Sequence, residues 1–462
     1  MIEKVVVQDL CIGCGVCAGM CPRGLLSMKF NKFGEYNACL DKPCEINCEL
    51  CLKVCPFSAG NDNEDALAKE LYADTGGIKH HKATGYYLKS YYGYSLENEH
   101  RANGSSGGLT TWLLEHLLVH KRVDRVVCVT SNDDPEKLFR FQVFDSVEGV
   151  RKAAGSAYYP IELSEVIKFI MINEGSFALV GLPCFVKAIR LAQKNNPKLR
   201  ERVRFLIGLV CGQLKSKHYT RFISAMAGVT DKPSTVYYRK KHSDKASSNF
   251  AFEVKGVHGK RAEICFQEGV GSVWTNKWFT PQSCSYCDDT FAELADIVLM
   301  DAWLPEYVSD SKGANLLIIR TADIDELIVC AAAQKRIYAA YIPLKRIIQS
   351  QAGVLKFKRD QLAYRLHLAE KYNGTVIVKR VVPANRLNFF AKKEVEIKER
   401  MRVRSRDEFL KIETLGQKET SLFLKKDLKN FLCWNGIYLY LLFPVRVLSK
   451  INRELRNIFR GK

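Results

Sequence analysis

The residues with the most distinctive chemistry are cysteines set at short intervals near the amino terminus. The first run has the pattern C-x2-C-x2-C-x3-C-P and consists of Cys11, Cys14, Cys17 and Cys21. Thiolates are soft ligands, and this spacing brings three of them to one iron–sulfur cluster while the fourth reaches another. The run therefore predicts binding of [4Fe-4S] clusters.

A second run ends in the same way, before Pro56, and consists of Cys44, Cys48, Cys51 and Cys55. Two such runs are typical of bacterial two-cluster ferredoxins, in which the fourth cysteine of each run ligates the cluster of the other. We expect one cluster on Cys11, Cys14, Cys17 and Cys55, and the other on Cys21, Cys44, Cys48 and Cys51. The first gap of the second run is one residue longer than in the first run, so Cys39 is an alternative to Cys44. A pair of zinc knuckles is the competing interpretation, which the two C-x2-C-x3-C-P endings disfavour.

Further cysteines lie far along the chain. Cys184 and Cys211 each follow an apolar, strand-like stretch and precede a helical pattern, and Cys284 and Cys287 form a C-x2-C pair. The carboxyl ends of strands in an open α/β sheet line its ligand crevice. Four thiolates are the number that a third [4Fe-4S] cluster requires, although a lone buried cysteine is more often a small apolar residue. We expect this second, structural role for Cys128, Cys265, Cys330 and Cys433.

A segment rich in serine and glycine precedes an apolar helical pattern that begins at Leu109, and it comprises Ser105, Ser106, Gly107 and Gly108. The free backbone N–H groups at the amino end of a helix attract phosphate, and glycine permits a close approach. The segment is therefore a candidate cofactor-binding loop. The alternative is a plain helix cap with a flexible lead-in.

The elements that must position these residues are strands and helices in alternation. Strand-like stretches lie at 126–129, 177–180, 204–210, 295–300 and 316–319, and helical patterns lie at 186–193 and 219–226. Such alternation is typical of an α/β fold. We predict a ferredoxin-like α+β module at 1–60, a polar connector at 61–83 that includes His80 and His81 in a solvated loop, an α/β core in two parts at 85–170 and 171–345, and a basic, mostly helical region at 346–462.

The net charge of +20 is concentrated in the last part of the chain, where residues 341–462 hold 28 Lys and Arg against 11 Asp and Glu. This distribution argues against nucleic-acid binding by the whole protein and favours a separate surface function of the tail. An uncharged aromatic stretch at 431–444 is too short to span a bilayer, and a basic amphipathic pattern follows it. We expect either peripheral contact with an anionic membrane or a helix packed on the core or a partner.

The cysteines and the amino-terminal residues together predict the cellular compartment of the protein. The amino terminus lacks the pattern of a secretory signal, and clustered thiolates require a reducing environment. We therefore expect a cytoplasmic protein, located at the inner face of the membrane if the tail contacts lipid.

Several motifs occur together in the order of a known family. They are 103–110, Gly181-Leu182-Pro183-Cys184, Cys211-Gly212, 284–289 followed by Ala295-Asp296-Ile297, and 313–321. Over residues 85–345 the chain resembles the family of coenzyme F420 hydrogenase/dehydrogenase beta subunits, several members of which have a ferredoxin domain in front.

The resemblance implies an α/β core that carries FAD beside one [4Fe-4S] cluster, with Cys184, Cys211, Cys284 and Cys287 as the cluster ligands. The flavin contacts that it implies are Ser105, Ser106, Gly107, Gly108, Gly155, Ser156, Tyr158 and Asp301. Two positions depart from the family: Ala157 stands where a lysine is usual, and Met300 where a glycine is usual. Both fall near the expected flavin and substrate pocket, so they bear on the substrate more than on the fold. Trp274, Trp278 and Trp303 could border the flavin ring, but we expect ordinary packing.

We therefore predict an oxidoreductase in which electrons pass between the head clusters, the core cluster and FAD. The family points to the deazaflavin coenzyme F420 as the two-electron partner. One alternative is an electron-transfer subunit without substrate chemistry, which would dock to a redox partner protein. Another is a membrane-peripheral redox protein of surface-polysaccharide metabolism.

Overall fold

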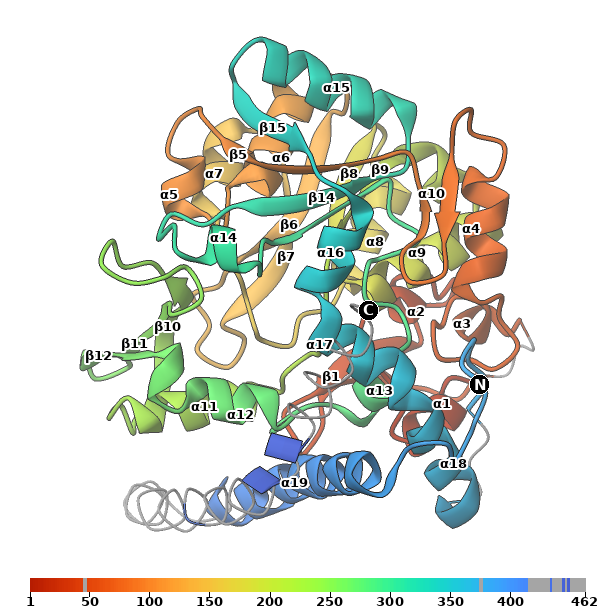
Figure 1. The fold of residues 1–462 in the computed structure, drawn as a ribbon. Coiled ribbons are helices and arrows are strands. Elements are labelled where there is room, and N and C mark those ends of the chain that lie inside the picture. The colour runs from red at the N-terminus through yellow and green to blue at the C-terminus, as the bar shows by residue number, and fades with distance from the viewer. Residues whose placement is uncertain (45–47, 374–376, 414–432, 434–442, 445–446, 449–462) are drawn as a thin grey trace, which may run out of the picture.

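The centre of the molecule is a mixed sheet with helices on both faces (Figure 1). The computed structural model describes residues 1–44, 48–373, 377–413, 433, 443–444 and 447–448. Within these residues the sheet has eight strands in the order β15-β5-β14-β13-β9-β8-β6-β7. They are β5 (Lys89–Ser95), β6 (Arg125–Ser131), β7 (Phe139–Phe144), β8 (Phe177–Gly181), β9 (Val203–Leu209), β13 (Ile297–Asp301), β14 (Asn315–Ile319) and β15 (Ile337–Tyr341).

Four neighbouring strands at the centre, β6, β8, β9 and β13, run parallel, and the outer pairs are antiparallel. Parallel strands are covered on both faces and therefore have nearly continuous apolar sequences. In β8, Phe177 and Leu179 pack on one face, while Ala178 and Val180 pack on the other. The mixed α/β core expected from the sequence is confirmed, and all five predicted strands belong to this sheet.

The helices that cover the sheet come from both halves of the core. One face is covered by α6 (Leu109–Val119), α7 (Val147–Lys152) and α15 (Ala322–Ala333). The other is covered by α8 (Ser164–Ile172), α9 (Pro183–Asn195) and α10 (Pro197–Arg202). The predicted helix at 186–193 begins earlier than expected because Pro183, whose φ suits a first helical position, starts α9 before Cys184. Two short helices, α5 (His100–Asn103) and α14 (Pro305–Val308), lie in loops between core elements.

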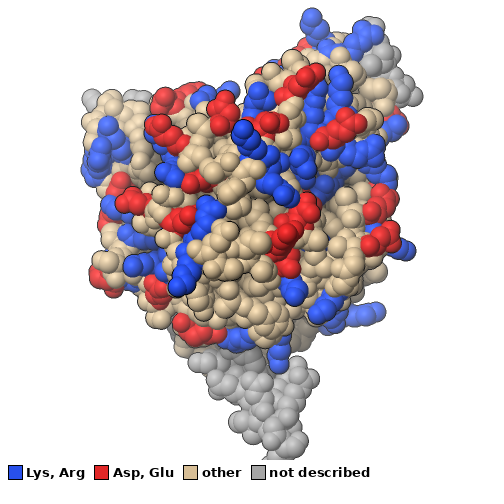
Figure 2. Space-filling model, turned by 90° about the horizontal axis from the view of Figure 1, so that it is seen from above, with Lys and Arg blue, Asp and Glu red and all other residues tan. Residues whose placement is uncertain are grey.

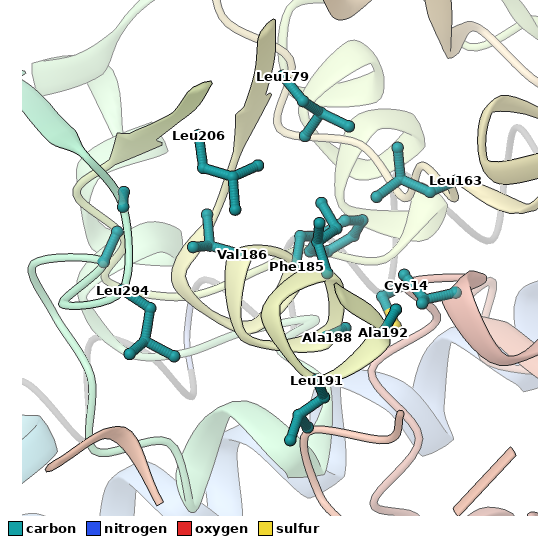
Figure 3. Close-up of a cluster of buried hydrophobic side chains, with 14 of the residues drawn as sticks. Cys14, Leu163, Leu179, Phe185, Val186, Ala188, Leu191, Ala192, Leu206 and Leu294 are labelled. Atoms are coloured by element: carbon teal, nitrogen blue, oxygen red, sulfur yellow. The ribbon is translucent and has the colours of Figure 1, made fainter. Parts of the chain in front are cut away.

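The amino-terminal head packs on the face that α8 and α9 cover. It contains α1 (Glu3–Val7), α2 (Val16–Gly19), α3 (Leu50–Lys53) and an antiparallel hairpin of β1 (Leu26–Phe30) and β2 (Tyr36–Leu40). Figure 3 shows α9 between the sheet residue Leu179 and Cys14 of the head. One apolar cluster therefore joins the head to the core.

The segment at 61–83 is not the polar connector that we predicted. It contains α4 (Glu64–Tyr72), whose first turn is capped by the Asn63 side chain. Leu67 and Tyr72 are buried, and the Tyr72 hydroxyl donates a hydrogen bond to the carbonyl of Leu294 in the core. The predicted loop with the two histidines is also wrong, because these residues pair as β3 (Lys79–His81) with β4 (Gly85–Tyr87).

A second, smaller sheet was not predicted. It consists of β10 (Pro233–Lys240), β11 (Ala251–Gly256) and β12 (Arg261–Cys265). Around it lie α11 (Lys217–Met226), the 3-10 turn η1 (Phe266–Glu268) and α12 (Val270–Thr275). The short helix α13 (Gln282–Ser285) follows along the chain. The helix predicted at 219–226 is α11, and the small sheet lies at the lower left of Figure 1, beside the carboxyl ends of the central strands.

The described part of the basic region is helical and packs against the head and the core. Its elements are α16 (Leu344–Ser350), α17 (Ala352–Leu355), the π-helical turn η2 (Lys356–Asp360), α18 (Leu362–Asn373) and α19 (Phe389–Glu413). Several of its cations are buried: Lys358, Arg365, Arg402 and Arg406. Part of the charge that suggested a separate surface function therefore lies inside the molecule. On the face seen from above, Lys and Arg are interspersed with Asp and Glu (Figure 2).

The predicted membrane segment at 431–460 lies almost entirely outside the described residues. Among the helices that the structure describes, none has the length and apolar character needed to cross a bilayer. Of the four cysteines expected in the core, Cys128 and Cys265 are buried, but Cys330 and Cys433 are exposed. Cys330 lies on the outer side of α15, which turns Ile324 and Ile328 toward the sheet.

Candidate functional site

One group of thiols in the head consists of Cys11, Cys14, Cys17 and Cys55. Burial raises the pKa of Cys17 well above its usual value, and the thiols of Cys14, Cys11 and Cys55 raise it further. Cys14, Cys17 and Cys55 are buried in one apolar cluster, and Cys11 packs against that cluster. Burial also raises the pKa of Cys11, while backbone hydrogen bonds from Ala38 and Gly13 oppose that shift. Such hydrogen bonds to sulfur favour the thiolate and tune a bound cluster.

The second group in the head lines a small cavity of about 30 Å³. The cysteines around it are Cys21, Cys44, Cys48 and Cys51. Cys39, the alternative to Cys44, is not among the residues that line this cavity. Its sulfur instead lies 3.7 Å from the carbonyl oxygen of Asn37, and its thiol acts on Cys11.

The third group is in the core and is assembled from three separate segments. Cys184 lies in the first turn of α9, Cys211 follows β9, and Cys284 and Cys287 lie in and just after α13. Burial raises the pKa of Cys184 well above its usual value, and the thiols of Cys287, Cys211 and Cys284 add to the shift. Four thiols that are distant in sequence are therefore brought together.

The three groups form a series from the head into the core. Cys51 of the second group acts on the pKa of Cys17 in the first, and Cys14 of the first acts on the pKa of Cys184 in the core. Figure 3 shows Cys14 beside the helix α9 that carries Cys184.

The cysteines fit iron–sulfur clusters by number and by arrangement into groups of four. The ligands of a single zinc ion converge on one point. Among the described residues no three His, Cys, Asp or Glu side chains converge in that way.

Three lysines lie near the core thiols, two of them fully buried, and no sequence motif pointed to them. The Lys358 ammonium in η2 donates to the Cys287 sulfur at 3.2 Å and to the Asp289 carbonyl at 2.6 Å. Burial alone would lower the pKa of Lys358, but the thiols of Cys287 and Cys211 raise it above its usual value. Burial lowers the pKa of Lys277 to about 7 and places that of Lys215 well below its usual value.

A cavity of about 530 Å³ lies at the carboxyl ends of the four parallel strands. Its lining includes Val129 after the middle of β6, Gly181 at the end of β8, Leu209 at the end of β9 and Asp301 at the end of β13. This is the crevice where open α/β sheets bind ligands, and its volume is in the range of about 300–1,000 Å³ for cofactor sites. Cys211 also lines the cavity, so the core thiols border it.

Most of the predicted flavin contacts line this cavity: Ser105, Ser106, Gly108, Gly155, Ser156, Tyr158 and Asp301. Gly107 is not among the lining residues. A Cβ atom on Gly107 would lie 2.7 Å from Oδ1 of Asn315, so this glycine lets the loop pack on the sheet. Gly108 has a φ of 78°, which favours glycine.

Hydrogen bonds tie the loop before α6 to the sheet and to the residue after β10. Gly108 is the cap residue of α6 and no side chain caps it. The backbone N–H of Leu109 donates to Asn315 Oδ1 instead. The Lys241 ammonium donates to the carbonyls of Arg101 and Ser106, at 2.6 and 2.7 Å, and this holds the loop against β10.

The small sheet supplies a cation to the cavity. Arg239 of β10 forms an ion pair of 2.7 Å with Asp301 and lies over the rings of Phe250 and Trp303. All four residues line the cavity. Trp274 lines it as well, whereas Trp278 is buried elsewhere. A lone arginine on an unpredicted strand has no local sequence signal, so Arg239 could not be found from the sequence.

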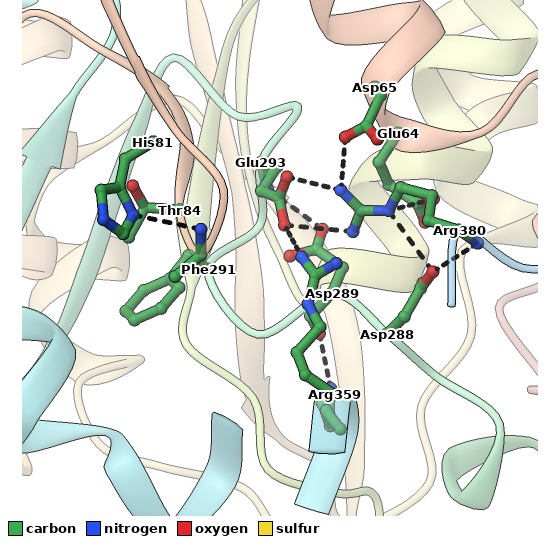
Figure 4. Close-up of polar contacts among 12 residues, drawn as sticks. Glu64, Asp65, His81, Thr84, Asp288, Asp289, Phe291, Glu293, Arg359 and Arg380 are labelled. Atoms are coloured by element: carbon green, nitrogen blue, oxygen red, sulfur yellow. Dashed lines mark hydrogen bonds and ion pairs between the residues drawn. The ribbon is translucent and has the colours of Figure 1, made fainter. Parts of the chain in front are cut away.

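A buried ion network lies next to the core thiols (Figure 4). The Arg380 guanidinium contacts Asp288 at 3.3 Å, Glu293 at 2.7 Å and Asp65 at 2.8 Å. Asp288 follows Cys287 directly, and Asp65 belongs to α4. The network therefore joins the basic region, the core and the helix after the head.

Comparison with known proteins gives three family matches. Residues 90–168 and 175–344 match the amino- and carboxyl-terminal models of the coenzyme F420 hydrogenase/dehydrogenase beta subunit, and together they cover more than half of the chain. Residues 4–27 match a 4Fe-4S binding domain.

Two curated relatives and one solved structure are similar to the chain. One subunit of the F(420)H(2) dehydrogenase of Methanosarcina mazei is 24% identical over 47% of this chain and 57% of its own length. The coenzyme F420-dependent sulfite reductase of Methanocaldococcus jannaschii is 23% identical over 71% of this chain and 46% of its own length. A chain of the F420-reducing [NiFe] hydrogenase complex from Methanosarcina barkeri aligns with a TM-score of 0.48 and 18% identity, covering 65% of this chain and 98% of that one. The chain thus spans about half the length of the two curated relatives.

Proposed function

The chain belongs to the family of coenzyme F420 hydrogenase/dehydrogenase beta subunits, and we propose that it is an iron–sulfur flavoprotein oxidoreductase. The proposed ligands are the three groups of four cysteines, and the proposed FAD site is the cavity of about 530 Å³. When bound, the clusters would carry single electrons and the flavin would exchange electron pairs with a substrate.

The observation that carries this proposal is the arrangement of the cysteine groups from the head to the core, where Cys211 lines the cavity. Cys51 and Cys17 link the two head groups, Cys14 and Cys184 link the head to the core, and Cys211 borders the cavity. Cysteines that served only as packing residues would have no reason to follow such a path. The series supports electron transfer between the head and a cofactor in the crevice.

The residues of the cavity suit a cofactor with phosphate groups and a flat ring. Ser105 and Ser106 precede α6, where a phosphate would meet the amino end of the helix. Trp274, Trp303 and Phe250 supply aromatic walls that exclude water. The Arg239 guanidinium, already paired with Asp301, places a positive charge near any anionic group in the cavity.

We propose coenzyme F420 as the two-electron partner because both curated relatives are named for F420 chemistry. Ala157 and Met300 line the cavity at the two positions where the family usually has lysine and glycine. Arg239 is a cation that could replace the missing lysine charge. Because of these two differences, the substrate of this chain could be a compound related to F420 and similar to it in shape.

A second candidate function is an electron-transfer subunit that has no substrate chemistry of its own. It is favoured by the fact that one relative is a subunit of a dehydrogenase and that the chain spans about half of each curated relative. Reduction of F420 or of a dye by the purified chain alone distinguishes the two. Turnover without an added subunit supports the enzyme, and turnover only with a partner supports the electron-transfer role.

The composition of anaerobically purified protein tests the proposal. We expect about twelve irons and one FAD per chain, from three four-iron clusters. Cys184→Ser should remove about four irons and leave the two head clusters, because Cys184 belongs to the core group.

The matched control is Cys128→Ser, because Cys128 is also buried and lines the cavity but belongs to none of the three groups. It should keep the full iron content. Equal iron content in the Cys184→Ser variant and the unaltered protein would show that the core thiols bind no cluster.

A further inference from the structure

Lys358 is a fully buried cation whose nearest partners include a cysteine of the core group. Its side chain is 1% exposed. The ammonium lies 3.2 Å from the Cys287 sulfur and 2.6 Å from the carbonyl oxygen of Asp289. An ammonium removed from water is costly unless it meets an opposite charge. The contacts therefore favour a negative group at this sulfur.

The backbone around Lys358 is arranged to bring the side chain inward. Residues Lys356–Asp360 form the π-helical turn η2, and π-helical turns often occur at functional sites. The ring of the neighbouring Phe357 is held between Lys277 and Arg365, each 3.9 Å from its centre. This packing fixes η2 against the core, so the position of Lys358 is set by the fold.

Lys358 differs from Lys215 and Lys277, the two other lysines near the core group. Lys215 donates to the carbonyl of Trp278 at 2.6 Å and to the Thr280 hydroxyl at 3.2 Å. Lys277 lies over the ring of Phe357. Of these three lysines, Lys358 is the one for which the structure shows a hydrogen bond to a core sulfur. Lys358 also follows the segment 175–344 that matches the family.

We propose that Lys358 raises the reduction potential of the core cluster by placing a fixed positive charge against the Cys287 thiolate. The proposal rests on the proposed function, in which Cys287 is a cluster ligand. Uptake of one electron makes the cluster one charge more negative, and a buried ammonium stabilises that form more than the oxidised form. Charge and hydrogen bonds at the sulfurs are known determinants of cluster potential.

The test is the midpoint potential of the core cluster in the Lys358→Met variant of the full-length, cluster-loaded protein. Methionine has a similar length and no charge. We expect the equilibrium constant for reduction of the core cluster to fall at least tenfold, which is about 59 mV for one electron. The potential is measured by an EPR-monitored redox titration, and the head clusters serve as internal references.

Lys356→Met is the matched control, because Lys356 lies in the same turn but is half exposed and paired with Glu394 at 2.9 Å. It should leave the core potential unchanged. A core potential in Lys358→Met equal to that of the unaltered protein, with full iron content, overturns the proposal.

A second variant covers loss of the cluster. If Lys358→Met loses the core irons, Lys358→Arg decides, because arginine keeps the charge and changes the shape. Retention of the core cluster by Lys358→Arg supports a role of the charge, and its loss there as well overturns the proposal. The two head clusters alone would give about eight irons per chain. If the unaltered protein holds only that number, the core cluster of the proposed function does not exist. That result differs from one in which the core cluster is present but its potential does not depend on Lys358.

Discussion

At the scale of single residues, the site combines thiols, buried cations and small residues that come from different parts of the chain. The head cysteines are neighbours in sequence, whereas the core group draws on Cys184, Cys211 and the pair near residue 285. The cations beside the core thiols come from η2 and from the loop before α13. A cluster with four thiolates is negatively charged, so the buried cations beside it would compensate that charge.

The serine at the entrance to α6 gives a prediction for the flavin site. Ser105 lines the cavity just before the amino end of α6. Ser105→Asp places a negative charge where a cofactor phosphate is expected, and the loss of a favourable contact to a charged group costs about 1.5–3 kcal/mol. We therefore expect FAD affinity to fall by about tenfold or more, measured by flavin fluorescence after rebinding.

The control for this change is Ser309→Asp, because Ser309 is exposed in the loop after α14 and is not among the residues that line the cavity. Iron content should be the same in both variants. If Ser105→Asp binds FAD as tightly as Ser309→Asp, the flavin phosphates do not lie at this loop.

At the scale of the elements, helix α6 connects the cavity with the far edge of the core. Its amino end faces the cavity, and its carboxyl end carries His116 and His120. The Arg336 guanidinium donates to His116 Nδ1 at 3.0 Å and approaches His120 Nε2 at 3.1 Å. An arginine that donates to a ring nitrogen requires that nitrogen to be unprotonated. The end of α6 is therefore sensitive to acid.

The pH dependence follows from the pKa of His116. Burial lowers this pKa from 6.5 to about 4, and His120 and Arg336 act in the same direction. Between pH 6.5 and about 4, His116 binds a proton in the unfolded chain but not in the folded chain. The neutral His116 therefore contributes fully to folding stability above pH 6.5, and this contribution is lost as the pH falls toward 4. We expect His116→Gln to lose less thermal stability than the unaltered protein between about pH 7.5 and about pH 5.5.

His258→Gln is the control, since His258 is exposed in the turn between β11 and β12. Its melting temperature should follow the unaltered protein at both pH values. A parallel decline in all three proteins would mean that His116 is not a source of the acid sensitivity.

At the scale of the whole molecule, the basic region holds the head and the core together. Arg406 of α19 pairs with Asp9 at 2.7 Å and with Glu35 at 2.9 Å, and both carboxylates belong to the head. Arg380 joins Asp65, Asp288 and Glu293, as Figure 4 shows. The part of the chain with the largest positive charge therefore neutralises carboxylates on the other two parts.

The Arg380 network gives a prediction for the stability of the assembled molecule. Removal of one partner from a buried ion network leaves uncompensated charge and costs about 3–5 kcal/mol. Arg380→Met leaves Asp288 and Glu293 with fewer cations in a buried site. We expect the free energy of unfolding to fall by about that amount, measured as a lower midpoint in urea.

Arg386→Met provides the comparison, because Arg386 is exposed in the same segment. It should change stability by no more than about 0.5 kcal/mol. Equal midpoints for the two variants would mean that the network does not hold the three parts together.

The elements and ligands whose information is local could be predicted from the order of the amino acids. Cysteines two or three residues apart remain near one another in any compact fold, so the head motif could be recognised from spacing. Apolar runs that must be buried on both faces identified the central strands, including β8 and β9. The ends of these strands then predicted positions near the crevice for Cys184 and Cys211, and Cys211 lines the cavity.

The contacts that join distant segments of the chain could be identified only from the tertiary structure. Lys358 meets Cys287, Arg239 meets Asp301 and Arg380 meets Asp65, and no local pattern relates the members of these pairs. The same reason explains the errors: burial of Tyr72 depends on the distant Leu294, and exposure of Cys330 depends on which face of α15 meets the sheet. Contacts of this kind are determined by the packing of elements, which amino-acid spacing along the chain does not record.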